Sequence, residues 1–355
     1  MSGITYYFFS DRRMKNRVYL DYNATAPLRT SARNAMLDAM DLVGNPSSVH
    51  AEGRKARSMM ETARAQVAAA IGADGDDIIF TSGATEAAAL GLAHSSLACS
   101  GIEHEAVISY CQVSLICDNQ GIVDVPSPSN SALQYANSET GIVQELPMQI
   151  AFCDMTQAFG KLPLAFNSTD VQMAAISAHK IGGPKGIGAL VVKRGTDISA
   201  QIKGGGQEMG RRSGTENLIG IAGFGAAAVC ASKDLELGLW EEIENLRDFL
   251  ENAIAEVDPS TTIVGQDIRR LPNTSCLVTP GWKGETQVMQ MDLNNIAISA
   301  GSACASGKVK TSRVLKTMGF DDKAASSAIR ISLGPETTKY DVERFLGCWI
   351  EKRNK

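Results

Sequence analysis

The sequence predicts an α/β protein in which a large, mostly parallel sheet lies between helices and a smaller α+β domain follows. Apolar runs of strand length alternate with amphipathic stretches in the middle of the chain. These runs are apolar throughout, which is typical of parallel strands buried on both faces. From about residue 235 long amphipathic helices dominate. We therefore expect a large α/β/α domain over 27–234 and a small α+β domain formed by 1–26 together with 235–355.

The expected elements follow one another in a simple order. Met60, Ala63 and Val67 fall on one stripe of a helix over 48–71, which Gly72 can end. Strands are expected at 78–80, 106–108, 150–153, 174–176 and 189–192. Two later helices are marked by apolar residues at helical spacing. The first has Leu239, Ile243, Leu246, Leu250 and Ile254, and the last has Val342, Phe345, Leu346, Trp349 and Ile350.

The composition excludes several classes of protein. The 355 residues are 44% hydrophobic and 21% charged, with a net charge of −5. This balance is ordinary for a soluble globular protein, and the negative net charge does not indicate binding to nucleic acid. We find no apolar run near the ~20 residues of a membrane span. Basic residues follow the aromatic patch at 6–9 rather than precede it, which is the wrong order for a secretory signal.

The eight cysteines suggest reduced thiols rather than a metal site or disulfides. None of them forms a CxxC pair, so no metal ligand set is expected. A chain of this length without an export signal is best placed in a reducing cytoplasm.

The first candidate site segment is Thr81–Glu86. It follows a strand and opens an Ala-rich helix, whose free N–H groups and positive dipole suit a phosphate. The alternative is an ordinary N-cap turn, which is commoner for such clusters.

The second candidate is Asp154, which closes an apolar strand. A carboxylate there needs a cationic partner. The pyridinium nitrogen of pyridoxal 5'-phosphate (PLP) is such a partner, and a carboxylate keeps that nitrogen protonated. The alternative is a helix N-cap.

The third candidate is Lys180, which comes straight after a strand and before a glycine-rich turn. Burial favours imine formation by such a lysine. Ser177 and His179 can bind phosphate. The glycine turn disfavours the alternative, a lysine that only reaches toward solvent. His104 could stack on a cofactor ring and move protons, although alone it would be an ordinary surface or core histidine.

The fourth candidate is Cys304, which stands among small residues in 299–307. An accessible loop of this kind is where a reactive thiol belongs. The alternative is a loop cysteine without function.

Together these segments resemble the cysteine desulfurases of the class V, fold type I group of PLP-dependent aminotransferases. Long motifs in the family's order carry the resemblance, and it covers most of the chain. The motifs lie at 18–26, 44–50, 204–217 and 329–334, together with the segments above. The resemblance implies the PLP-dependent transferase fold and conversion of L-cysteine to L-alanine.

The resemblance also implies a role for each matching residue. Lys180 would hold PLP as a Schiff base, and Cys304 would receive sulfur as a persulfide and pass it to an acceptor protein. Around the ring, His104 would stack on it, Asp154 would pair with the pyridinium, and Gln157 would bond to the phenolic oxygen. The phosphate would be bound by Ala84, Thr85, Ser177 and His179, and by Thr215 from the second subunit of a homodimer with shared active sites. Arg330, near Asn137 and Ser138, would recognise the substrate carboxylate.

The sequence departs from the family pattern at four places. Ser138 stands where the family usually has a second asparagine, which would weaken carboxylate binding by ~1–2 kcal/mol if one hydrogen bond is lost. The segment 141–149 is too short for the helix that the family places there, and 111–135 is also short, so part of the sheet is expected to be exposed. Pro335 stands where arginine is frequent.

These departures keep other functions open. One alternative is a related class V enzyme, such as a selenocysteine lyase or an aminotransferase-like enzyme for another amino acid. A second is a catalytically altered scaffold that retains the fold. A nucleotide-binding protein is disfavoured, because the glycines of 182–188 and 204–206 do not fit the known spacings.

Overall fold

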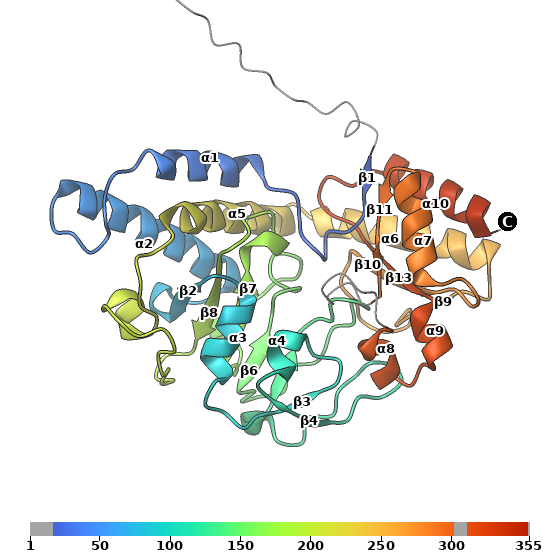
Figure 1. The fold of residues 1–355 in the computed structure, drawn as a ribbon, viewed down its shortest axis with the longest axis horizontal. Coiled ribbons are helices and arrows are strands. Elements are labelled where there is room, and N and C mark those ends of the chain that lie inside the picture. Colours follow the sequence, from blue (N-terminus) through green and yellow to red (C-terminus); the bar gives the residue numbers. More distant parts are fainter. Residues whose placement is uncertain (1–16, 302–310, 354–355) are drawn as a thin grey trace, which may run out of the picture.

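The computed structural model describes residues 17–301 and 311–353 and contains a central sheet (Figure 1). Its strand order is β2 (Ile78–Thr81), β8 (Gly188–Val192), β7 (Met173–Ser177), β6 (Phe152–Asp154) and β5 (Ala132–Gln134). Strands β7, β6 and β5 are parallel, and β8 is antiparallel to both of its neighbours. The parallel pair β3 (Ala98–Ser100) and β4 (Gln112–Leu115) continues beyond β5 through a bridge between Ala98 and Ser131. The prediction of a mostly parallel sheet is confirmed.

Helices cover both faces of this sheet (Figure 1). Ile78 and Phe80 pack with α2 (Ala51–Ile71) and α5 (Leu218–Glu236), and α1 (Thr30–Met40) lies over α5. Ile79 points the other way, toward α3 (Ala84–Leu92) and α4 (Glu105–Ile108). Successive side chains of a strand alternate between faces, so apolar residues at every position bury both.

A second sheet lies toward the C-terminal part of the chain. Its order is β12 (Ser299–Ala300), β13 (Ala328–Ser332), β10 (Thr274–Val278) and β9 (Thr262–Ile263), all antiparallel. Strand β1 (Val18–Tyr19) pairs with β11 (Ile296–Ala297). Leu20 packs in the same core as Leu277 and Trp349, so the segment after residue 17 joins this part of the fold. The helices around this sheet are α6 (Leu239–Val257), α7 (Gly284–Leu293), α8 (Arg313–Thr317), α9 (Asp322–Ser326) and α10 (Lys339–Arg353).

Several sequence predictions of local structure need correction. Residues 106–108 belong to the short helix α4, because a triplet of apolar residues has no period that separates strand from helix. His104 therefore precedes a helix, and β6 covers 152–154 rather than 150–153. The predicted helix 48–71 begins at Ala51 behind the cap His50, and it ends as expected at Gly72, where φ is 70°.

Helix α5 did not emerge from the sequence pattern. By length and composition it is apolar enough to cross a membrane. It packs instead against α1 and α2, where Gly223 and Gly225 allow close approach. A Cβ at Gly225 would lie 2.8 Å from Ala63. We read α5 as a core helix, apolar on most sides because neighbours surround it.

The short segment before β6 does not expose the strands beside it. Between Gln134 and Phe152 the structure has no helix, which confirms that the segment is too short for one. Strands β5 and β6 are nevertheless buried, and the exposed strand is β4, where Gln112, Val113 and Ser114 face solvent. The exposed strand is thus the one at the edge, and the strands next to the short segment stay covered.

Candidate active site

A cavity of about 440 Å³ opens where the parallel strands end. The last residues of β5 and β6, Gln134 and Asp154, lie opposite each other, and Asp154 lies opposite Ala175, two residues before β7 ends. Ligands bind at this edge in open α/β sheets. The lining includes Ser82, Gly83, Ala84, Thr85, His104, Gln134, Ser138, Asp154, Thr156, Gln157, Ser177, His179, Lys180 and Lys185.

A glycine brings the first turn of α3 close to the strands. A Cβ at Gly188 would lie 2.6 Å from the carbonyl of Ile176 and 2.8 Å from the backbone of Gly83. Only glycine lets these segments approach so closely. The backbone N–H groups of Ala84 and Thr85, in the first turn of the helix, have no acceptor within it.

Lys180 lies in the single 3₁₀ turn Ala178–Lys180 that follows β7, and it is half-buried. Its Nζ donates to the carbonyl oxygens of Asn23, at 2.6 Å, and Ala24, at 3.0 Å. Neither carbonyl carries a full charge. The amine is thus held at the cavity wall by neutral acceptors.

Asp154 and His104 present a carboxylate and an imidazole to the same cavity. Oδ1 of Asp154 accepts a hydrogen bond from the backbone N–H of Thr156 at 2.9 Å. Nδ1 of His104 accepts from the backbone N–H of Ala106 at 3.1 Å, which caps α4. The neutral ring therefore carries its proton on Nε2.

The end of the cavity near α3 is suited to a phosphate. Ser177 is buried there, and Nδ1 of His179 lies 3.2 Å from the hydroxyl of Thr25. Burial, followed by the cations Lys180 and Lys185, lowers the pKa of His179 to about 4. His179 is therefore a neutral hydrogen-bonding group at pH 7, and Lys185 is the exposed cation at the rim.

The predicted substrate residues differ in their access to the cavity. Ser138 lines it, whereas Asn137 does not and is only 1% exposed. Oδ1 of Asn137 accepts from the backbone N–H groups of Glu139 and Thr140, at 2.8 and 2.9 Å, so its amide shapes the turn that presents Ser138. Sequence alone could not show which of these adjacent residues faces the cavity.

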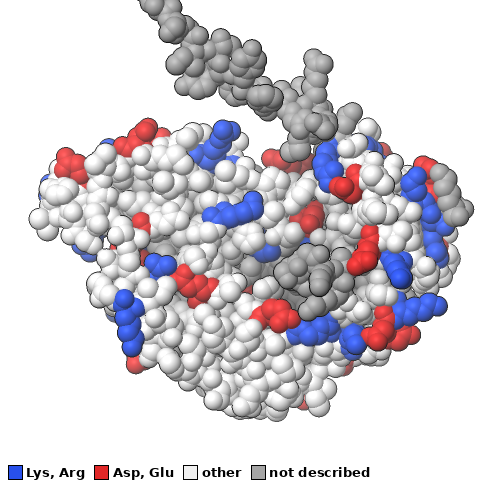
Figure 2. All heavy atoms as spheres, viewed as in Figure 1, with Lys and Arg blue, Asp and Glu red and all other residues white. Residues whose placement is uncertain are grey.

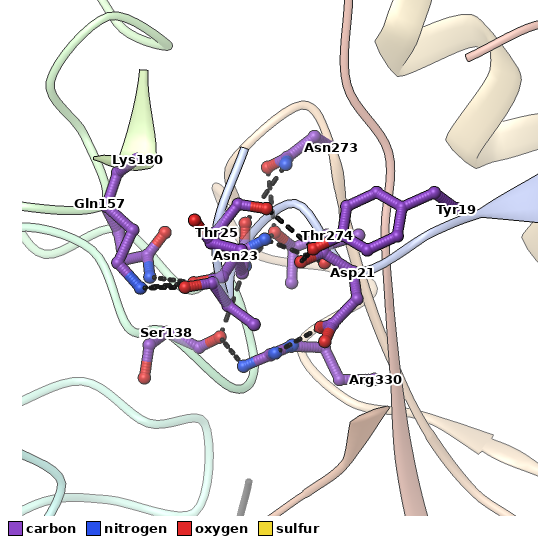
Figure 3. A network of polar contacts seen from close by, with 12 residues as sticks. Tyr19, Asp21, Asn23, Thr25, Ser138, Gln157, Lys180, Asn273, Thr274 and Arg330 are labelled. Carbon is purple, nitrogen blue, oxygen red and sulfur yellow. Dashed lines mark hydrogen bonds and ion pairs between the residues drawn. The ribbon is translucent and has the colours of Figure 1, made fainter. Parts of the chain in front are cut away.

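Arg330 lies behind Ser138 on β13 and does not line the cavity. Its guanidinium donates to the Ser138 carbonyl at 3.0 Å and pairs with Asp21 at 2.7 Å (Figure 3). Within the described residues its buried Nε has no partner. An incoming carboxylate would have to compete with Asp21 for this arginine.

Thr215 does not line this cavity, and Cys304 cannot be placed relative to it. Thr215 is exposed and lines a neighbouring hollow of about 250 Å³, whose lining shares Ser82 and Gly186 with the cavity. Cys304 lies outside the described residues. Just beyond that gap, the hydroxyl of Ser312 donates to Oε2 of Glu139 at 2.5 Å.

Sequence reasoning missed three polar residues around the site, which are Asn23, Lys161 and Glu139. Asn23 is the centre of the network in Figure 3. It stands in the motif at 18–26, and Glu139 directly follows Ser138. Lys161 follows Gln157 by four residues, which is a weak signal for a shared side of a turn.

Glu139 gives the stability of the protein a testable pH dependence. Burial, opposed by Ser312 and Arg330, raises its pKa from 4.5 to about 7. The unfolded chain therefore ionises first, so this carboxyl lowers the free energy of unfolding as the pH rises from 4.5 to 7. Glu139→Gln removes this loss. Its stability relative to wild type should rise over that window by about 3 kcal/mol.

Thermal or urea unfolding of both proteins at pH 5 and pH 8 measures this difference. The matched control is Glu256→Gln, since Glu256 is exposed. A Glu139→Gln stability difference that is the same at both pH values would contradict the prediction.

The donor set of the cavity fits PLP. An amine, a carboxylate and an imidazole face the cavity together with a helix N-terminus, and these groups suit the aldehyde, the ring nitrogen, the ring face and the phosphate of PLP respectively. Among the described residues no group of acidic, histidine and cysteine side chains could hold a metal ion.

Comparison with known proteins identifies the family. The family model Aminotransferase class-V matches residues 18–117 and 125–345. A cysteine desulfurase of Cereibacter sphaeroides is 38% identical over 371 aligned residues, covering 93% of this chain and 94% of that protein. The structure of a NifS-like protein from Rickettsia africae ESF-5 matches with a TM-score of 0.87 and 32% identity over 96% of this chain and 100% of the other. The structure of SspA in complex with cysteine matches with a TM-score of 0.73 and 28% identity over 90% and 99%. The chain therefore belongs to the class V aminotransferase family of PLP-dependent enzymes.

Proposed function

We propose that this enzyme is a cysteine desulfurase that converts L-cysteine to L-alanine. The observation that carries the proposal is the convergence of Lys180, Asp154 and His104 on one cavity. Relatives that cover 93% of the chain bear the name cysteine desulfurase, and the solved SspA is in complex with cysteine. A thiol at Cys304 agrees with sulfur chemistry.

Each cavity residue has a proposed role toward PLP. Lys180 would bind it covalently, Asp154 would pair with the ring nitrogen, Gln157 would donate to the phenolic oxygen, and His104 would stack on the ring. The phosphate is held by Ala84, Thr85, Ser177 and His179, and Thr215 contributes from a second subunit. When bound, PLP supplies an electron sink for bonds broken at the substrate α-carbon.

The protein side chains carry out the remaining steps. Ser138 and Arg330 orient the substrate carboxylate, and Asn137 supports the turn that holds Ser138. Lys180, once displaced, takes the α-proton. The Cys304 thiolate then forms an S–S bond as the substrate Cβ–S bond breaks. The electron pair of that bond passes to Cβ, which takes up a proton, so alanine leaves and Cys304 carries a persulfide.

We further propose a cytoplasmic homodimer with shared active sites that passes sulfur to an acceptor protein. Exposed apolar side chains on and after α1 support a subunit contact there, namely those of Leu37, Met40 and Val43. Figure 2 shows basic and acidic side chains mixed over the visible face, so this face offers nucleic acid no surface of a single sign. We keep 27–234 and 1–26 with 235–355 as the proposed domains.

Product analysis of the PLP-loaded protein tests the proposed function. L-Cysteine should give alanine and sulfide in equal amounts when a thiol reductant is present. Selenocysteine as the preferred substrate would favour a selenocysteine lyase. A keto acid product would favour an aminotransferase. A protein that binds PLP but turns over none of these amino acids would favour the altered scaffold.

Ser138→Asn should strengthen substrate binding. Ser138 lines the cavity, and its carbonyl already fixes Arg330, so a longer amide here can reach the substrate carboxylate. One added hydrogen bond of about 1.4 kcal/mol corresponds to a KM for L-cysteine lower by about tenfold, with kcat changed less. Steady-state kinetics measure both constants. Ser138→Ala is the control for loss of the hydroxyl, and a KM raised by the asparagine would contradict the prediction.

A further inference from the structure

Lys161 is a buried lysine beside the candidate site for which the proposed function has no use. It is 2% exposed, and its Nζ donates to Oδ1 of Asn23 and Oε1 of Gln157, each at 2.8 Å. The charged groups that act on it are the cations Lys180 and Arg330. Burial first, and then these two cations, hold the pKa of Lys161 well below its ordinary value. A lysine in such a setting depends on its hydrogen bonds.

The local backbone explains why Lys161 reaches Gln157. The chain after β6 forms a helical turn, in which the N–H of Phe159 donates to the carbonyl of Met155 at 2.8 Å and that of Lys161 to Ala158 at 3.0 Å. Residues four apart lie on the same side of such a turn. The pair is thus built into this segment.

The network determines which way the Gln157 amide points. Its Nε2 donates at 3.0 Å to the backbone carbonyl of Asn23, which can only accept. Its Oε1 must therefore face Lys161. A carboxamide nitrogen carries two protons, and only one goes to Asn23. The second is left for the cavity that Gln157 lines.

Asn23 connects this amide to Lys180. Its carbonyl accepts from Lys180 as well as from Gln157. Its side chain is fixed on three sides besides Lys161, by Thr274 at 2.9 Å, Ser138 at 3.2 Å and Asn273 at 3.1 Å (Figure 3). Lys161 therefore completes the set of contacts around both Asn23 and Gln157.

We propose that Lys161 is a positioning residue, which holds the Gln157 amide so that its remaining N–H points at the phenolic oxygen of PLP. The proposal rests on the proposed function, because it requires PLP in the cavity. A donor to this oxygen stabilises its negative charge, and therefore makes the Schiff base nitrogen release its proton at lower pH. Without Lys161 the amide can turn away, and that proton is held to higher pH.

The pH titration of the visible absorbance of the PLP-loaded protein tests this proposal. Lys161→Met keeps the length of the side chain and removes its donors. Its titration midpoint should rise by about one pH unit, which corresponds to one hydrogen bond. Lys161→Gln supplies an uncharged N–H donor and should keep the midpoint near that of wild type. A double-mutant cycle completes the test, since Lys161→Met should add no further shift in a Gln157→Ala background.

Four results would overturn the proposal. They are an unchanged midpoint in folded Lys161→Met, equal shifts in the methionine and glutamine variants, an additive shift in the Gln157→Ala background, and failure of both Lys161 variants to fold. Equal shifts would indicate that the charge of Lys161 causes the effect. Failure to fold would indicate that Lys161 serves stability alone. A wild-type protein that gains no visible absorbance with PLP would instead overturn the proposed function.

Discussion

Replacing Lys180 with alanine should abolish the visible absorbance of the PLP-loaded protein and lower turnover of L-cysteine by roughly 10⁴-fold. In the proposed mechanism, the variant loses both the amine that binds the cofactor and the base that takes the α-proton. In the structure no other described lysine can replace it, because Lys161 is fixed by two amide oxygens and Lys185 is exposed at the rim. Absorbance spectra and alanine formation measure the two losses.

The matched control is Lys193→Ala. Lys193 follows β8 at the end away from the cavity and pairs with Asp170 at 2.8 Å, with about a third of its side chain exposed. This variant should keep the spectrum and the activity. A Lys180→Ala protein that retains the visible band would show that the cofactor is attached elsewhere.

The strand ends were the part of the site that the sequence could predict. An apolar strand followed at once by Asp154, or by Ser177 and Lys180, combines burial with a polar side chain that requires a partner. All of these residues line one cavity, because parallel strands end at the same edge. The roles assigned to them remain predictions.

The polar network behind the cavity could not be predicted in this way. Asn23 is bonded to Lys161 and Asn273, which lie 138 and 250 residues away in the chain. No local period or spacing marks such contacts. They form only once the segment after β1 packs against both the turn after β6 and the residues before β10.

Short elements and adjacent polar residues are a second part of the structure that the sequence could not predict. The triplet at 106–108 would be apolar as a strand or as a helix. In the structure it is a helix, whose start is capped by the hydrogen bond from the N–H of Ala106 to Nδ1 of His104. Asn137 and Ser138 are both polar turn residues, and only the turn geometry shows that Ser138 faces the cavity. Sequence patterns locate such segments. They do not show whether a short segment forms a strand or a helix, or which of two adjacent side chains faces a cavity.

Cys304→Ala should separate cofactor chemistry from sulfur transfer. The variant should keep the visible absorbance, since none of the proposed PLP contacts involves Cys304. Its release of alanine and sulfide from L-cysteine should fall by roughly 10³-fold or more, because a nucleophile is lost rather than weakened. Sulfide and alanine assays, with mass spectrometry for the persulfide on wild type, measure this difference.

Three of the other cysteines are poor substitutes for this thiol. A thiolate is the attacking form, so a raised pKa makes a cysteine inert at pH 7. Burial raises the pKa of Cys117 to about 11 and that of Cys276 to about 12, and it holds the pKa of Cys153 well above its ordinary value. None of these thiols lines the cavity.

Cys111 is the informative control, because a hydrogen bond with Cys99 lowers its pKa. It lies beside β4 and does not line the cavity, so Cys111→Ser should keep full desulfurase activity. If Cys111→Ser lost activity while Cys304→Ala retained it, the sulfur acceptor would be misassigned. Full activity in both single variants would mean that sulfur leaves the substrate without a protein thiol, and the desulfurase mechanism proposed for this chain would be wrong.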